Sequence, residues 1–167
     1  MIDVLFVALV FQHSISRPDV YFSPHGGCTA AIVAEVGRAK KSIRVQAFSF
    51  TSKPIVEALN VAAGRKVDVI TILDGGQVKA RSSLGLAMKS PVTYDFMHAI
   101  AHNKVMIIDE NTVITGSFNF TASAEEHNAE NMLVIRSRDL AKRYRENWEL
   151  HLRHSKDSKT AHEPPEP

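Results

Sequence analysis

The 167-residue sequence lacks several features that mark specialised classes of protein. Its one cysteine, Cys28, excludes an intramolecular disulfide and any CxxC metal pair. Positive and negative charges nearly balance and leave a net charge of +2, so net charge alone is weak evidence for a polyanionic partner. With 44% hydrophobic and 23% charged residues, the composition is that of an ordinary globular protein. The length predicts a single domain with its own core.

The two ends of the chain differ in character from the part between them. The apolar run Val4–Phe11 is too short to span a bilayer, which takes about 20 residues. It could serve as the core of a secretory signal, but Asp3 stands where such signals are basic, and no clear cleavage site follows. We expect residues 1–17 to be an apolar arm or a remnant signal, 18–153 to fold, and 154–167 to be a disordered polar tail.

Between the ends, strand-like and helix-like patterns alternate with short connections. This order predicts parallel pairing and right-handed crossovers. The expected fold class is α/β, with a mixed, largely parallel central sheet flanked by helices on both faces. Strands are expected at 20–22, 43–50, 67–73, 91–94, 102–108, 112–116 and 128–135, and helices at 29–41, 52–64, 77–88 and 138–152.

The most informative stretch is 102–121, and it occurs once. It places an imidazole, an ammonium, a hydroxyl and an amide on neighbouring extended segments: His102, Lys104, Ser117 and Asn119. A fixed cation and neutral donors stabilise the negative charge that develops on a phosphoryl group. An imidazole can attack phosphorus or carry a proton near neutral pH. The combination suits cleavage of a phosphodiester.

The register of the expected hairpin decides whether these four side chains meet. Residues i and i+2 of a strand share a face. A two-residue loop at 110–111 would pair Asp109 with Thr112 and place all four side chains on one face. A slip of one residue would divide them between the two faces. In the expected register Asp109 points away from the cluster, so we expect it to brace the turn.

A catalytic imidazole needs an orienting partner on its second ring nitrogen. Glu130, on the strand expected beside this hairpin, is the carboxylate candidate for His102. The sequence reveals no carboxylate cluster suited to magnesium and no histidine triad suited to zinc. We therefore expect metal-independent chemistry without a cofactor. His98 is interpreted as a groove or surface residue.

The pattern His102-x-Lys104-x4-Asp109 followed by Gly116-Ser117-x-Asn119 resembles the HKD signature of the phospholipase D superfamily. Within it, the chain is most similar to the small single-motif bacterial endonucleases of the Nuc type. Asp109 and Gly116 belong to the signature as structural positions. The resemblance covers roughly residues 19 to 152 and includes the stretches 21–24, 41–44, 48–51, 67–69 and 128–131 and the helix that carries Trp148.

The resemblance implies a phospholipase D-like fold and a site built from two motifs. One histidine becomes a covalent phosphohistidine, and the other protonates the leaving oxygen and then activates water. Because this chain has one motif, the resemblance implies a two-fold homodimer with both His102 residues near the axis. Lys104 and Asn119 of both subunits would hold the phosphate. Ser117 would contact the phosphate or the second histidine, and Glu130 would orient His102.

Several functions stay open within this framework. The leading hypothesis is a nonspecific endonuclease that cleaves DNA, with an RNA-directed nuclease as an alternative. Basic clusters at 38–41, 65–66 and 136–145 fit either a phosphate-tracking patch or a solvated surface. The alternatives are a phospholipase or cardiolipin hydrolase, with the run 4–11 as its candidate membrane contact, and a nonenzymatic nucleic-acid-binding module. A segment 75–101 shorter than in Nuc-type enzymes leaves the substrate open, and both an exported and a cytoplasmic location stay open.

Overall fold

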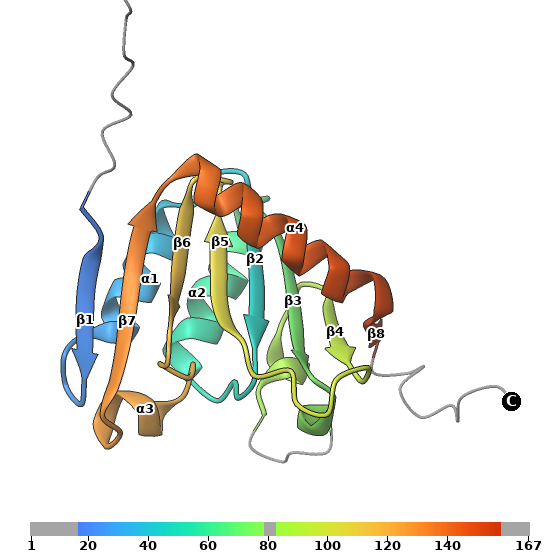
Figure 1. Ribbon diagram of the computed structural model, residues 1–167, viewed down its shortest axis with the longest axis horizontal. Helices are drawn as coiled ribbons and strands as arrows, with labels where there is room; N and C mark the ends of the chain where they lie inside the picture. The colour runs from blue at the N-terminus through green and yellow to red at the C-terminus, as the bar shows by residue number, and fades with distance from the viewer. Residues whose placement is uncertain (1–16, 79–82, 158–167) are drawn as a thin grey trace, which may run out of the picture.

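Strands and helices alternate along residues 17–78 and 83–157, the part of the chain that the computed structural model describes (Figure 1). The strands are β1 (Asp19–Ser23), β2 (Ser42–Ala47), β3 (Asp68–Asp74), β4 (Val92–Asp95), β5 (Lys104–Ile108), β6 (Thr112–Gly116), β7 (Glu130–Arg136) and β8 (Lys156–Asp157). The helices are α1 (Cys28–Arg38), α2 (Lys53–Gly64), α3 (Ala122–Glu126) and α4 (Arg138–His154), with two 3₁₀ turns, η1 (Gly75–Val78) and η2 (Gly85–Ala87).

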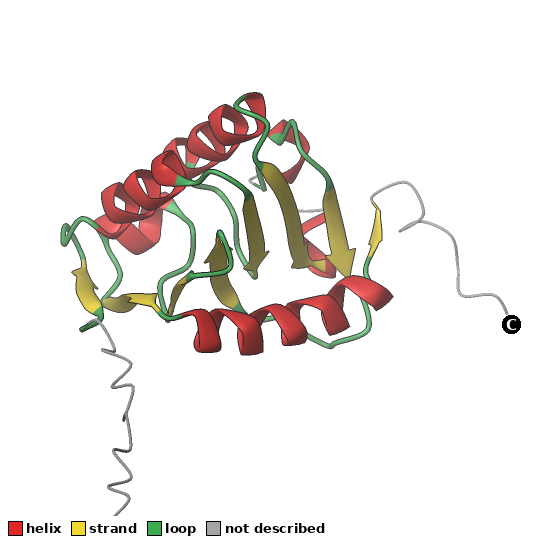
Figure 2. Ribbon diagram, turned by 90° about the horizontal axis from the view of Figure 1, so that it is seen from above, coloured by secondary structure: helices red, strands yellow, loops and turns green. Residues whose placement is uncertain are grey.

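The described strands form one eight-stranded sheet in the order β1-β7-β6-β5-β2-β3-β4-β8. Helices α1 and α2 cover one face and α4 crosses the other (Figure 2). The predicted α/β class, with a mixed sheet and helices on both faces, is therefore confirmed. Of the seven adjacent pairs only β2–β3 and β3–β4 are parallel. The parallel part is smaller than predicted, because the antiparallel meander of β5, β6 and β7 separates β1 from β2.

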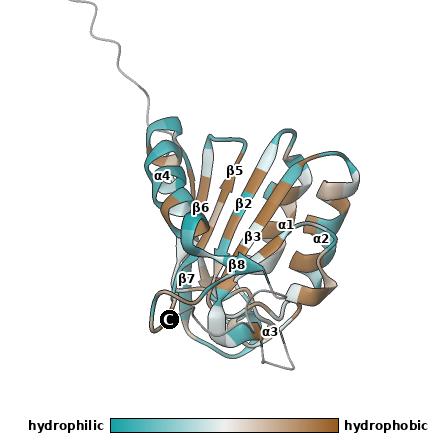
Figure 3. Ribbon diagram, turned by 90° about the vertical axis from the view of Figure 1, so that its right-hand side faces the viewer, coloured by the Kyte–Doolittle hydropathy of each residue, from teal (hydrophilic) through white to brown (hydrophobic). Residues whose placement is uncertain are grey.

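Helices α1 and α2 pack on the sheet through the apolar stripes that their periodicity predicts. Ile32 and Val36 of α1 and Leu59 of α2 are fully buried. They share one apolar cluster with Ile43 and Val45 of β2. In Figure 3 the brown colour of hydrophobic residues runs along α1, α2, β2 and β3. Burial of each such side chain stabilises the fold by about 1.5–3 kcal/mol, so this layer holds the centre of the sheet in place.

Helix α4 is anchored on the opposite face by Trp148. The Trp148 side chain is 1% exposed, and its Nε1 donates a hydrogen bond to the Val45 carbonyl oxygen at 2.9 Å. Leu140, Tyr144 and Leu152 pack around the same apolar cluster. The predicted stripe on this helix is therefore core packing. The Ser137 hydroxyl caps the helix by accepting a hydrogen bond from a backbone amide in its first turn.

The hairpin of β5 and β6 departs from the predicted register by one residue. Thr112 pairs with Ile108 rather than with Asp109, so the turn contains three residues, 109–111, instead of two. Asp109 and Glu110 adopt positive φ angles of 52° and 56°, which the longer turn requires. The four polar side chains consequently do not share one strand face. His102, Ser117 and Asn119 lie outside the strands, in the segments that enter β5 and leave β6.

The Asp109 carboxylate accounts for the longer turn. It accepts hydrogen bonds from the backbone amides of Lys40, Lys41 and Ser42 at 2.7–3.0 Å. The Asp109 amide in turn donates to the Ser42 carbonyl oxygen at 2.9 Å. Burial alone would raise the pKa of Asp109, but the three amide donors outweigh burial and lower it. The charged side chain thus ties the β5–β6 turn to the start of β2.

Two shorter elements and one predicted helix also differ from expectation. A helix over 77–88 is wrong for the described residues, since η1 ends at Val78 and η2 spans Gly85–Ala87. A Cβ on Gly85 would lie 2.8 Å from side-chain atoms of Leu73 and Tyr94, so close packing on the sheet holds the chain there. Helix α3 and strand β8 escaped prediction because five and two residues are too few to show a period.

The predicted terminal segments fall largely outside the described residues. Arg17 is the one described residue of the arm at 1–17. Of the tail at 154–167, His154 ends α4 and Lys156–Asp157 form β8, whereas 158–167 lie outside the described part. Among the described helices, none is both long and apolar enough to cross a membrane.

We predict that Trp148→Ala lowers the free energy of unfolding by about 3–5 kcal/mol, because it leaves a cavity and removes the hydrogen bond from Trp148 to the Val45 carbonyl oxygen. Urea denaturation followed by circular dichroism measures this change. Leu150→Ala on the same helix removes a half-exposed side chain and should change stability by less than about 0.5 kcal/mol. Equal effects of the two variants would contradict the anchoring role of Trp148.

We also predict that Asp109→Asn lowers the free energy of unfolding by about 1–2 kcal/mol at neutral pH. The pKa of Asp109 is lower in the folded than in the unfolded chain, so its contribution is complete above the unfolded value of about 3.9. It is lost as pH falls through the lower folded value. Urea denaturation between pH 7 and 3 should therefore show wild type and variant converging at the acid end.

Glu57→Gln, on the exposed surface of α2, is the matched carboxylate control for Asp109→Asn. The control should follow the wild-type stability across the whole pH range. A constant gap between wild type and Asp109→Asn down to pH 3 would show that the charge of Asp109 is not what stabilises the turn.

Candidate active site

Except for Asp109, the signature residues lie at one edge of the sheet, where β6 ends and β5 and β7 begin (lower edge in Figure 1). We call it the signature edge. His102 lies two residues before β5, and Lys104 is the first residue of that strand. Gly116 ends β6, and Glu130 begins β7. The ends of antiparallel strands therefore bring His102, Lys104, Ser117 and Asn119 to this edge, although the four side chains do not share one strand face.

Lys104 is a largely buried cation held beside His102. Lys104 is only 6% exposed, and its Nζ donates a hydrogen bond to the His102 carbonyl oxygen at 2.7 Å. Nζ also lies 5.2 Å from the centre of the Phe48 ring. Burial lowers the pKa of Lys104, and the negative charge of Glu130 opposes that shift. Such a partly desolvated ammonium interacts more strongly with a phosphate than one in bulk water.

The His102 side chain is exposed, but its backbone is firmly placed. Its ring packs against Phe48 with centroids 4.7 Å apart. The Phe48 amide donates to the Asn103 carbonyl oxygen at 3.0 Å. On the other side, the Ala101 amide donates to a carboxylate oxygen of buried Asp74 at 2.8 Å. The imidazole therefore reaches solvent from a backbone that β2 and β3 fix on both sides.

Asp74 is a positioning residue that the sequence analysis did not single out. It ends β3, and its second carboxylate oxygen accepts a hydrogen bond from the Gly76 amide at 3.0 Å. The signal that could have found it is the Asp-Gly-Gly sequence directly after a buried strand. A carboxylate at the end of a central strand is placed to hold a neighbouring loop.

The segment after β6 is shaped by close backbone contact with β7. A Cβ on Gly116 would lie 2.2 Å from the Asn131 carbonyl oxygen, which accounts for glycine at this signature position. The Ser117 hydroxyl accepts hydrogen bonds from the amide and side-chain nitrogens of Asn131 at 3.1 and 3.4 Å. Phe118 and Phe120 are buried and fix the segment. The amide oxygen of Asn119 is buried without a hydrogen-bond partner in the described residues.

Glu130 lies close enough to Lys104 to act on its pKa. Its carboxylate accepts a hydrogen bond from the Asn128 side chain at 3.2 Å. No hydrogen bond joins Glu130 to His102 among the described residues, so its orienting role stays a prediction. Asp109 lies at the other end of β5 and binds backbone amides there, as described for the turn.

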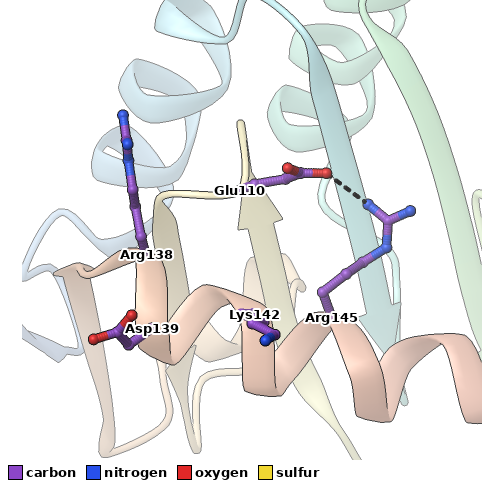
Figure 4. A pocket seen from close by; sticks show the side chains of 5 residues that line it. All are labelled: Glu110, Arg138, Asp139, Lys142 and Arg145. Carbon is purple, nitrogen blue, oxygen red and sulfur yellow. Dashed lines mark ion pairs between the residues drawn. The ribbon is translucent and has the colours of Figure 1, made fainter.

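The basic clusters lie at the opposite edge of the sheet, near the start of β2 and α4. A shallow hollow there is lined by Glu110, Arg138, Asp139, Lys142 and Arg145 (Figure 4). In it Arg145 pairs with Glu110 at 3.5 Å. A second hollow follows α4 between residues 140 and 147. Neither hollow contains a signature residue, and the choice between a phosphate-tracking patch and a solvated surface for the basic clusters stays open.

Comparison with known proteins agrees with this geometry. The family model described as cardiolipin synthase, PLD-like domain, matches residues 32–151. The crystal structure of Nuc from Salmonella typhimurium, a phospholipase D family member, is 36% identical with a TM-score of 0.79. That match covers 84% of this chain and 97% of Nuc. NucT from Helicobacter pylori shares the fold at 19% identity and a TM-score of 0.78, over 84% of this chain and 98% of NucT.

Curated relatives carry two kinds of name. A protein named phospholipase D from Rickettsia felis is 43% identical over 136 residues, which is 80% of this chain and 68% of the relative. A mitochondrial cardiolipin hydrolase from Xenopus tropicalis is 29% identical over 119 residues, which is 67% of this chain and 55% of the relative. Signature, fold and relatives agree, and the chain belongs to the phospholipase D superfamily of phosphodiesterases.

Proposed function

We propose that this protein is a metal-independent phosphodiesterase that cleaves DNA internally without sequence specificity. The observation that carries the proposal is an exposed imidazole, His102, fixed beside a largely buried ammonium, Lys104. The similarity to Nuc over almost its whole length supports a nucleic-acid substrate, since the single-motif architecture resembles that of small endonucleases.

The proposed reaction has two displacements at phosphorus. A ring nitrogen of His102 attacks, the phosphorus–nitrogen bond forms, and the phosphorus–oxygen bond to the leaving group breaks. His102 of a second subunit gives its proton to the leaving oxygen. It then takes a proton from water, which displaces the first imidazole and releases the phosphate end. Lys104 and Asn119 offset the charge on the non-bridging oxygens throughout.

Two copies are required because nucleophile and acid must lie on opposite sides of phosphorus in an in-line displacement. One imidazole cannot occupy both sides. The exposed position of the His102 side chain fits a site that is completed by a second subunit.

A part of the sheet that no described helix covers offers a surface for that second copy. Val20 and Phe22 of β1 are 51% and 65% exposed and share a face. Tyr21 between them packs on the core of α1 and α2, so this pair faces the side that α4 crosses. Helix α4 leaves β1 uncovered on that side (Figure 1). Phe22 pairs with Asn131, whose side chain contacts Ser117, so this surface adjoins the signature edge.

Phospholipid is the second candidate substrate, and a specific observation favours it. Large apolar side chains are exposed on the segments before His102: Leu86 at 82%, Phe96 at 43%, Met97 at 68% and Ile100 at 59%. Exposed apolar groups beside a phosphodiesterase site could enter the acyl region of a membrane surface while the headgroup is cleaved. The cardiolipin hydrolases among the relatives are consistent with this alternative.

We predict that the full chain cleaves labelled single- or double-stranded DNA in excess EDTA and that His102→Ala lowers the rate by at least about 10³-fold. The rate falls because the substitution removes both the nucleophile and the acid, which are the two copies of His102 in the proposed dimer. His127→Ala, which alters an exposed histidine that is not part of the signature, should cleave like wild type. Cleavage that stops in EDTA and returns with magnesium would contradict the mechanism. Hydrolysis of cardiolipin in vesicles without cleavage of DNA would show that phospholipid, and not DNA, is the substrate.

We predict that Phe22→Asp converts the protein from dimer to monomer in sedimentation equilibrium and lowers phosphodiesterase activity in parallel, because it places a charge in the proposed interface. Val61→Asp, at a 60% exposed site on α2, is the matched control and should leave the mass and activity unchanged. A Phe22→Asp protein that stays dimeric and active would assign the interface to another surface.

A further inference from the structure

Four side chains with metal-binding groups meet where the end of β4 faces the end of α4: Asp95, His98, His151 and His154. One ligand atom from each lies within 4.8 Å of all the others. Asp95 is fully buried, whereas the His151 and His154 side chains are 15% and 20% exposed and that of His98 is 45% exposed. The group is thus buried at its carboxylate and open to solvent on one side.

Three imidazole nitrogens converge on a single carboxylate oxygen. Oδ2 of Asp95 lies 3.0 Å from Nδ1 of His98, 2.7 Å from Nδ1 of His151 and 3.2 Å from Nε2 of His154. The other oxygen, Oδ1, already accepts from the Met97 amide at 3.0 Å and lies near the His98 amide and ring. One oxygen offers two lone pairs, so three N–H donors crowd it. A cation among the four groups would instead accept a lone pair from each.

The scaffold holds these ligands on defined elements. His151 and His154 are three residues apart in the last turn of α4 and so share a helix face. Asp95 ends β4, which pairs with β3 on one side and with β8 on the other. Trp148 fixes the same part of α4 on β2. Three of the four ligands are therefore placed by regular structure, as a preformed site requires.

The donor set selects the class of ion. Three imidazoles and one carboxylate suit a tetrahedral Zn²⁺ site, whereas Mg²⁺ and Ca²⁺ prefer oxygen ligands. With metal–ligand bonds of about 2.0–2.1 Å, ligand atoms of a tetrahedral site stand about 3.3 Å apart. The distances from Asp95 to the imidazoles already approach this value. The wider spacing between imidazoles can close by rotation of their rings, most easily for exposed His98.

We propose that Asp95, His98, His151 and His154 bind one divalent transition-metal ion, Zn²⁺ by preference, which ties the loop before His102 to α4. The sequence analysis assigned His98 to the surface and saw no histidine triad, because 56 and 59 residues separate Asp95 from its partners on α4. The ion is structural. It takes no part in the chemistry at His102, which lies four residues beyond His98 and is held by Asp74 and β2.

The test uses the full chain, stripped of metal with a chelator and titrated with Zn²⁺ against a chromophoric zinc indicator. We expect one tight site per chain, a rise in Tm when Zn²⁺ is added, and an intense visible spectrum typical of tetrahedral Co²⁺ when cobalt replaces zinc. His151→Gln should weaken Zn²⁺ binding by at least about tenfold and abolish the rise in Tm. His127→Gln, outside the cluster, is the matched control and should bind like wild type.

His98→Gln guards against a variant that simply unfolds, because His98 lies on an exposed loop outside the helices and strands. This protein should keep its metal-free Tm and lose at least about tenfold in Zn²⁺ affinity. A wild-type chain that binds no Zn²⁺, or binding that neither His98→Gln nor His151→Gln weakens, would overturn the proposal and leave a hydrogen-bonded cluster. These readouts do not depend on cleavage of any substrate.

Discussion

The register of β5 between β2 and β6 is the constraint on which the candidate site depends. Lys104 enters the sheet opposite Ala47, and the far end of the same strand is fixed by the Asp109 carboxylate. A slip of one residue would turn Lys104 to the opposite face of the sheet. Asp109 therefore supports the signature edge from the opposite end of β5, a strand of five residues. It does so by holding the register of the strand and not by contact with the phosphate.

The electrostatics of the signature edge follow from the same arrangement. Phosphoryl transfer without a metal needs a cation that is already in place, because reorganisation during the reaction would raise the barrier. Burial of Lys104 against Phe48, with its ammonium hydrogen-bonded to the His102 carbonyl, provides that fixed charge. The imidazole itself is left exposed. This combination of a buried charge and an exposed imidazole, the proposed nucleophile, fits the proposal that the second half of the site comes from another copy of the chain.

The loop between β4 and β5 connects two kinds of chemistry. One end carries the cluster around Asp95, and the other ends at His102. Asp74 holds the loop directly before His102 through the Ala101 amide. The exposed apolar residues of the same loop lie next to the signature edge, so its conformation bears on which phosphodiester can approach.

Local pattern was sufficient for most helices and strands and for the residues of the signature. The stripes of α1, α2 and α4 and the strand runs are periodic, and period depends only on neighbours in the chain. The signature spacing likewise pointed to His102, Lys104, Ser117 and Asn119. The fold class followed from the order of these elements.

Tertiary structure decided what local pattern could not. One additional turn residue changed the β5–β6 register, because Asp109 binds amides about 70 residues earlier in the chain. The meander placed β1 at the sheet edge, and long-range packing brought His151 and His154 to Asp95. Each of these depends on hydrogen bonds between segments far apart in sequence, which no local spacing records. The sequence by itself determined the chemical groups and the types of element, and only the packed sheet decided which groups meet.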